Sequence, residues 1–81
     1  MRSFYALLLL AFSAAAATAD DKADCQDGID YIRVEMAKQP AAEVLDVLQE
    51  ALEDAERELG EEEYDECFEA IEDARIAVEG E

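Results

Sequence analysis

Apolar residues recur at helical spacing through most of the chain after Asp20, and two short interruptions divide the pattern into three segments. Gln39-Pro40 forms the first, since proline cannot continue a helix but fits the first turn of the next one. Gly60 forms the second, because a glycine just after a helix adopts the left-handed conformation at low cost. No strand-like alternation appears. The pattern predicts an all-α fold, with helices over residues 27–38, 40–59 and 61–78.

Each predicted helix has one apolar face. The inward residues are Ile29, Ile32 and Met36 in the first helix, Ala41, Leu45, Leu48, Leu52, Ala55 and Leu59 in the second, widened by Val44 and Val47, and Tyr64, Cys67, Phe68, Ile71, Ala74 and Val78 in the third. Asp24 or Asp27 is expected to cap the first helix. Tyr31 falls off the apolar face and is expected to be exposed. Three amphipathic helices with short connections pack most simply as an up-down-up three-helix bundle.

The first nineteen residues have the organisation of a secretory signal peptide. Arg2 is followed by an apolar stretch over 4–12 and a small-residue segment over 13–19. The apolar stretch is shorter than the roughly 20 residues of a membrane-spanning helix. We therefore expect cleavage before Asp20, an acidic three-helix domain over residues 20–81, and a periplasmic protein with no membrane insertion after cleavage.

Two cysteines, Cys25 and Cys67, remain after the predicted cleavage. In an exported chain they indicate a single disulfide, and an up-down-up bundle brings the starts of the first and third helices together. Free thiols and an intermolecular bridge are the alternatives. The closed loop of about forty residues corresponds to roughly 4 kcal/mol of stabilisation by the chain-entropy estimate. For so small a domain, the bond would supply much of the net stability.

The charge is strongly negative: the chain has 23 acidic residues against six Lys and Arg, a net charge of −17. Residues 61–73 alone hold eight carboxylates and no base. Such a balance argues against binding to nucleic acid and favours metal cations or a basic protein partner. The chain has no His and no nucleophile–base pattern, so we expect that it is not an enzyme.

The candidate metal ligands lie in this acidic segment. Carboxylates at i, i+3, i+4 and i+7 spacing form an outward row on the predicted third helix, where like charges repel by a few tenths of a kcal/mol per pair. The row consists of Glu62, Asp65, Glu66 and Glu69, with Glu63 at its edge. A multivalent cation would convert that repulsion into attraction, whereas a merely solvated charged face is the alternative. Asp24 and Asp27 are weaker candidates on the first helix.

The types of side chain that can act as ligands indicate which metal ions would bind. With no His, and with both cysteines assigned to the disulfide, no soft ligand remains for zinc or copper. Carboxylate oxygens suit hard cations such as Ca²⁺, Mn²⁺ or a trivalent lanthanide. The standard twelve-residue calcium loop is absent. Water, a small anion or a second protein molecule could complete the shell of a site on a helix surface.

The predicted signal peptide, the short acidic domain, the two cysteines and the segment Glu61-Glu62-Glu63-Tyr64-Asp65-Glu66-Cys67 resemble the landiscernin-like small periplasmic lanthanide-binding proteins. These proteins accompany lanthanide-uptake systems in methylotrophic bacteria. The resemblance implies lanthanide (La- or Nd-type) binding at an exposed carboxylate site and a role in uptake, trafficking or buffering. It also implies a metal-bridged homodimer. The alternative function is an acidic helical module that docks a basic periplasmic partner, with charge steering the association.

Overall fold

A computed structural model describes the backbone of residues 2–80 and the side chains of residues 20–80. The chain forms three α-helices: α1 (Arg2–Ala37), α2 (Ala42–Gly60) and α3 (Tyr64–Glu79). No strand occurs within residues 2–80, and the predicted all-α class is confirmed.

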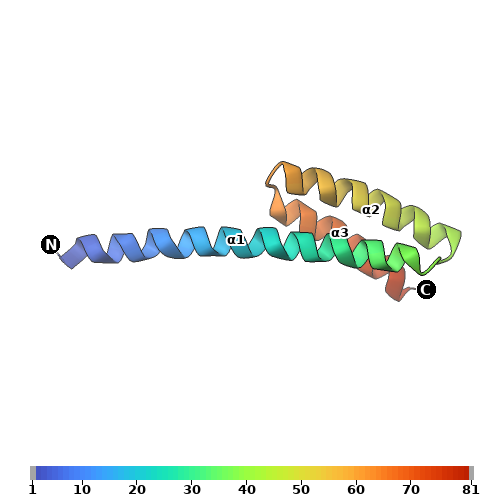
Figure 1. Cartoon of the computed structure of the whole chain (residues 1–81), viewed down its shortest axis with the longest axis horizontal. Helices are drawn as coiled ribbons and strands as arrows, with labels where there is room; N and C mark the ends of the chain where they lie inside the picture. The colour runs from blue at the N-terminus through green and yellow to red at the C-terminus, as the bar shows by residue number, and fades with distance from the viewer. Residues whose placement is uncertain (1, 81) are drawn as a thin grey trace.

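The helices form the predicted up-down-up bundle (Figure 1). α2 runs back along α1, and α3 runs in the same direction as α1. Every pair of helices is in contact. The N-terminal part of α1 extends beyond the other two helices, which gives the molecule a longest dimension of 63 Å. The bundle is therefore formed by α2, α3 and the C-terminal part of α1.

The predicted start of the first helix is wrong. α1 runs without a break through Asp24 and Asp27, so neither residue can be its N-cap. The alanine-rich residues 14–19 favour helix, which explains the continuity. Over the part of the chain with described side chains, no helix is long and apolar enough to cross a membrane. The side chains of residues 1–19 lie outside this part, and the signal peptide stays a prediction.

The core is thin and consists mostly of small and medium-sized side chains. Its buried members are Cys25, Ile29, Ile32, Leu48, Ala51, Ala55, Cys67, Ala70, Ile71 and Ala74, with Tyr31, Met36, Val44, Leu52, Leu59, Tyr64, Phe68 and Val78 packed against them. Most residues of the predicted apolar faces belong to this set, but Ala41 and Val47 are exposed, and Leu45 is half-buried without belonging to the core. No polar or charged side chain in residues 20–80 is fully buried.

Both connections between helices depend on a non-glycine residue with positive φ. Gln39, just before Pro40, has φ 58°, and Glu62 has φ 61°. The prediction that Gly60 takes the left-handed position is wrong, because Gly60 is the last residue of α2. Glu62 N–H donates to the Leu59 carbonyl (3.1 Å) and Glu63 N–H to the Glu58 carbonyl (2.9 Å). This pair of bonds is a Schellman motif that ends α2 with Glu62 at its left-handed position.

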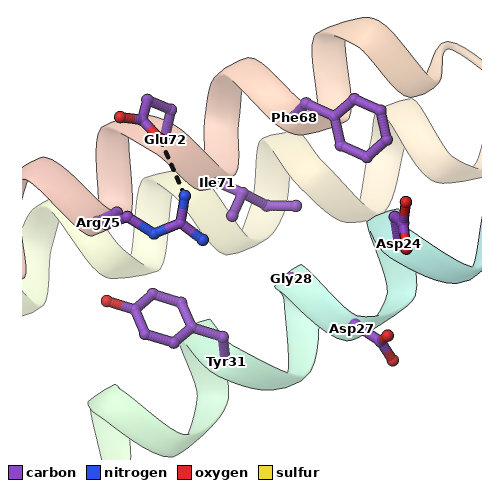
Figure 2. Close-up of a pocket in the computed structure, with 8 residues that line it drawn as sticks. All are labelled: Asp24, Asp27, Gly28, Tyr31, Phe68, Ile71, Glu72 and Arg75. Atoms are coloured by element: carbon purple, nitrogen blue, oxygen red, sulfur yellow. Dashed lines mark hydrogen bonds and ion pairs between the residues drawn. The ribbon is translucent and has the colours of Figure 1, made fainter. Parts of the chain in front are cut away.

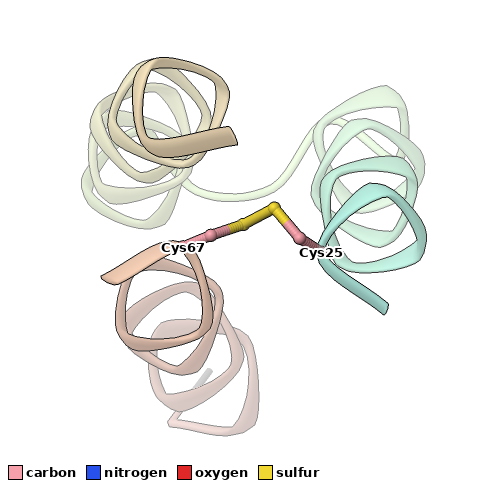
Figure 3. The surroundings of a disulfide bond; sticks show 2 residues. All are labelled: Cys25 and Cys67. Carbon is pink, nitrogen blue, oxygen red and sulfur yellow. A yellow bond between two sulfur atoms is a disulfide. The ribbon is translucent and has the colours of Figure 1, made fainter. Parts of the chain in front are cut away.

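The predicted disulfide is present. Cys25 of α1 and Cys67 of α3 are bonded, with their Cα atoms 6.0 Å apart (Figure 3). Both side chains are fully buried. No free cysteine is present in the described part of the chain. The bond therefore joins the first and third helices, which the up-down-up topology places side by side.

α1 and α3 approach each other closely at Gly28. A Cβ atom at this position would lie 2.1 Å from Cδ1 of Ile71 and 2.8 Å from its Cγ1. Glycine inside a helix is less favourable than alanine by about 1 kcal/mol. Its presence in α1 is explained by the space that Ile71 needs, and Gly28 also lines a hollow that is described below.

Candidate functional site

The structure separates the five predicted metal ligands into two groups. Glu62 and Glu63 do not lie on α3, which begins at Tyr64. They form the turn between α2 and α3, since the Schellman motif uses their backbone N–H groups to end α2. The predicted four-residue row on one helix is therefore wrong at its first member. Asp65, Glu66 and Glu69 are on α3 and exposed, as expected.

Glu66 and Glu69 line an open groove between α2 and α3, and Asp65 does not. One part of this groove, about 190 Å³, is lined by Asp54, Arg57, Glu58, Glu66, Glu69, Ala70 and Asp73. An adjoining hollow of about 180 Å³ is lined by Val47, Glu50, Ala51, Asp54 and Asp73. We call the two together the α2–α3 groove. Six carboxylates line it against a single base, Arg57.

The arrangement of the carboxylates follows from the antiparallel packing of α2 and α3. Glu50, Asp54 and Glu58 stand four residues apart and so share one side of α2. The remaining acids, Glu66, Glu69 and Asp73, have helical spacing on α3. Arg57 contacts Asp54 at 3.0 Å and Glu58 at 3.8 Å. Its charge offsets only a small part of the negative potential in the groove.

Glu58 and Glu66 come from different helices and interact through their carboxyl groups. A hydrogen bond to Glu66, partial burial and the nearby charges of Glu66 and Glu61 raise the pKa of Glu58 to about 7, while Arg57 acts in the opposite direction. The side chain of Glu58 is only 13% exposed. When one of two neighbouring carboxyl groups is protonated, it donates a hydrogen bond to the other carboxylate. This hydrogen bond holds the two groups together.

The groove has donors suited to a hard cation but no ready-made cage. Its acidic side chains offer carboxylate oxygens, which are the ligands that Ca²⁺ and related ions prefer. Among the residues that the structure describes, no three acids or cysteines converge closely enough to hold a metal ion. An ion bound here would have to draw exposed side chains together, or take ligands from water or from another molecule.

A second hollow lies between α1 and α3 and contains the weaker candidates Asp24 and Asp27 (Figure 2). We call it the α1–α3 pocket. It has a volume of about 500 Å³ and is lined by Asp24, Asp27, Gly28, Tyr31, Phe68, Ile71, Glu72 and Arg75. Asp24 and Asp27 are thus not in the α2–α3 groove. The prediction that Tyr31 is exposed is wrong in part, because Tyr31 is half-buried below Arg75.

The acids on the α2 side of the groove were not among the predicted metal ligands. Asp54 and Glu58 were visible in the sequence as acids close to the end of the second helix, where negative charge opposes the helix dipole. Glu50, Asp54 and Glu58 are spaced four residues apart, and this spacing could have indicated that they share one side of the helix. Which acids of α3 they would meet depended on how the two helices pack.

Comparison of this chain with known protein families, with curated proteins and with solved structures finds no match.

Proposed function

We propose that this protein binds hard cations in the α2–α3 groove, with trivalent lanthanide ions preferred to Ca²⁺. The observation that carries the proposal is the pair formed by Glu58 and Glu66. The two carboxyl groups come from different helices and line the same part of the groove. Their hydrogen bond raises the pKa of Glu58 so that it keeps a proton, and four further acids line the groove. A cation can replace that proton and bind both groups at once.

The preference for a trivalent ion follows from the charge of the groove. Coulomb attraction to a set of carboxylates increases with the charge of the ion, and six acids face one arginine here. Carboxylate oxygens are hard donors and suit lanthanides as well as Ca²⁺. The resemblance of the chain's organisation to the landiscernin-like proteins supports the same ion, and with it a role in lanthanide uptake, trafficking or buffering. The periplasmic location rests on the predicted signal peptide.

The coordination shell in this proposal includes ligands from outside the chain. Because no three described acids converge, water or carboxylates of a second molecule complete the shell. In a metal-bridged homodimer, carboxylates of the second molecule take the place of water ligands, so this form needs the fewest waters. Sedimentation analysis with and without La³⁺ tests this part, and a protein that stays monomeric at saturating La³⁺ would leave water as the remaining ligand.

The test of the site compares two double variants. Glu58→Gln with Glu66→Gln removes the shared pair, whereas Glu43→Gln with Asp46→Asn removes the same charge from exposed positions of α2 outside the groove. Calorimetric titration with La³⁺ should show affinity at least tenfold lower for the groove variant, about 1.4 kcal/mol. The control should bind nearly as tightly as the parent protein. Equal losses in both would mean that the ion responds only to net charge.

A third double variant tests the turn against the groove. Glu62→Gln with Asp65→Asn removes two predicted ligands that do not line the groove. We expect a small effect on La³⁺ affinity. If this pair abolishes binding while the groove variant binds normally, the ion lies at the turn and the start of α3.

Stability provides an independent readout. An ion that binds only the folded state raises the free energy of unfolding by RT ln(1 + [L]/Kd). La³⁺ should therefore raise the melting temperature more than NaCl at matched ionic strength, which acts by screening alone. The same increase with both salts would contradict specific binding.

A further inference from the structure

The α1–α3 pocket shares no residue with the α2–α3 groove, and α3 contributes different residues to each. Its centre is apolar: Ile71 is buried, and Gly28 opposite has no side chain (Figure 2). An aromatic ring stands toward each end, Tyr31 at one and Phe68 at the other. Both rings are half-buried against the core. The pocket thus has two similar halves, each with a ring and at least one carboxylate.

One half already holds a cation from the chain itself. The guanidinium carbon of Arg75 lies 5.6 Å from the centroid of the Tyr31 ring. The same guanidinium donates to Glu72 with an N–O distance of 3.0 Å. A planar cation over a ring, paired with a carboxylate, is a favourable combination. This half therefore shows what kind of side chain the pocket accepts.

The other half has the same groups without a base. Figure 2 shows the Phe68 ring beside Asp24, and Asp27 is one helical turn further along α1. In the described part of the chain, neither Asp24 nor Asp27 forms an ion pair. Both are exposed. A ring and the carboxylate of Asp24 are thus arranged for a cation that this chain does not supply, and Asp27 lies at the edge of the pocket.

We propose that the α1–α3 pocket docks a basic segment of a partner protein, with an arginine or lysine side chain between the Phe68 ring and Asp24, and with the charge of Asp27 at the edge of the pocket. Charge complementarity favours this occupant, since a net charge of −17 attracts a basic partner and repels a second copy of the same chain. A volume of about 500 Å³ accommodates the side chain together with apolar neighbours, which would contact Ile71 across Gly28. The proposal is independent of cation binding and gives the alternative function a defined surface.

The test uses a synthetic peptide in which two arginines flank a leucine, and a matched peptide with citrulline in place of both arginines. Citrulline has nearly the same shape as arginine but no charge. Both are titrated into the purified protein in chelator-treated buffer, so that metal ions play no part. We expect the arginine peptide to bind and to shift the amide NMR signals of Gly28 and Phe68. We expect the citrulline peptide to bind at least tenfold more weakly.

Two double variants separate docking from general attraction. Asp24→Asn with Asp27→Asn removes the carboxylates of the pocket, and Glu43→Gln with Asp46→Asn removes equal charge from exposed sites outside it. The pocket variant should lose at least tenfold in affinity for the arginine peptide, and the control less than twofold. Phe68→Leu should also weaken binding, provided that circular dichroism shows an unchanged helical fold.

Several results would overturn the proposal. Equal losses in the two double variants would show diffuse attraction to an acidic surface. Equal binding of both peptides would show an apolar pocket with no preference for a cation. NMR shifts confined to the α2–α3 groove would place the basic peptide on the other face. Pocket shifts that appear on concentrating the protein alone, with dimers in sedimentation, would identify a second copy as the occupant.

Discussion

Glu58 retains its proton to a higher pH than an ordinary glutamate because it faces other acids. Glu66 of α3 accepts its hydrogen bond, and Glu61 in the turn adds negative charge, while Arg57 on its own helix opposes the effect. The pKa rises from an ordinary value of 4.5 to about 7. Between these values the folded state binds more protons than the unfolded chain, so folding and protonation support each other.

The stability that Glu58 contributes should therefore be fully present below pH 4.5 and lost as the pH rises through about 7. We expect the melting temperature to fall between pH 5 and pH 8, and Glu58→Gln to flatten this dependence and raise the melting temperature at pH 8. Glu53→Gln, an exposed acid of α2 outside the groove, is the control. A Glu58→Gln profile that coincides with that of the parent protein would contradict the shared proton.

At the scale of elements, the turn that ends α2 determines where α3 begins, and therefore which acids lie on α3. Glu62 adopts φ 61° and its N–H closes the Schellman motif on Leu59. A non-glycine residue in the left-handed region is strained by roughly 1–2 kcal/mol. Glycine would relieve that strain and is the residue most often found at this position.

We expect Glu62→Gly to increase the free energy of unfolding by about 1 kcal/mol, measured by urea denaturation. Glu62→Gln keeps the strain and removes the charge, so the difference between the two variants isolates the backbone effect. La³⁺ affinity should change little in either. A less stable Glu62→Gly variant would mean that the carboxylate matters more to folding than the left-handed backbone does.

At the scale of the whole molecule, the disulfide compensates for a core made largely of alanine and medium-sized aliphatic residues. It links Cys25 and Cys67, 42 residues apart in sequence, across the parallel helices α1 and α3. The chain-entropy estimate for such a loop is about 4 kcal/mol, compared with a net stability of roughly 5–15 kcal/mol for ordinary domains. Without the disulfide, the bundle should be only marginally stable.

Reduction, or the double variant Cys25→Ala with Cys67→Ala, should lower the urea midpoint by an amount that corresponds to about 4 kcal/mol. Mass spectrometry of unreduced protein should show no thiol that alkylates freely. Two alkylated cysteines in that sample, or an unchanged urea midpoint after reduction, would contradict the role of the bond.

The sequence by itself determined the local elements, because helical periodicity and chain breaks act over a few residues. The break at Pro40, the pairing of Cys25 with Cys67 and most of the apolar faces were predicted correctly, although Ala41 and Val47 of the second predicted face are exposed. Two chain-local details were wrong. Helical propensity continues upstream of Asp27, and the left-handed position at the end of α2 falls on Glu62, two residues after Gly60.

Only the tertiary structure decided which carboxylates face one another. The acids of α2 and α3 lie far enough apart in sequence that no local pattern pairs Glu58 with Glu66, and the antiparallel packing of the two helices creates that contact. The pocket beside Gly28 likewise depends on packing, because its lining comes from α1 and α3, which approach each other closely where Gly28 meets Ile71. Charge density can be read along a chain, but the positions of charges relative to one another depend on how the helices are packed.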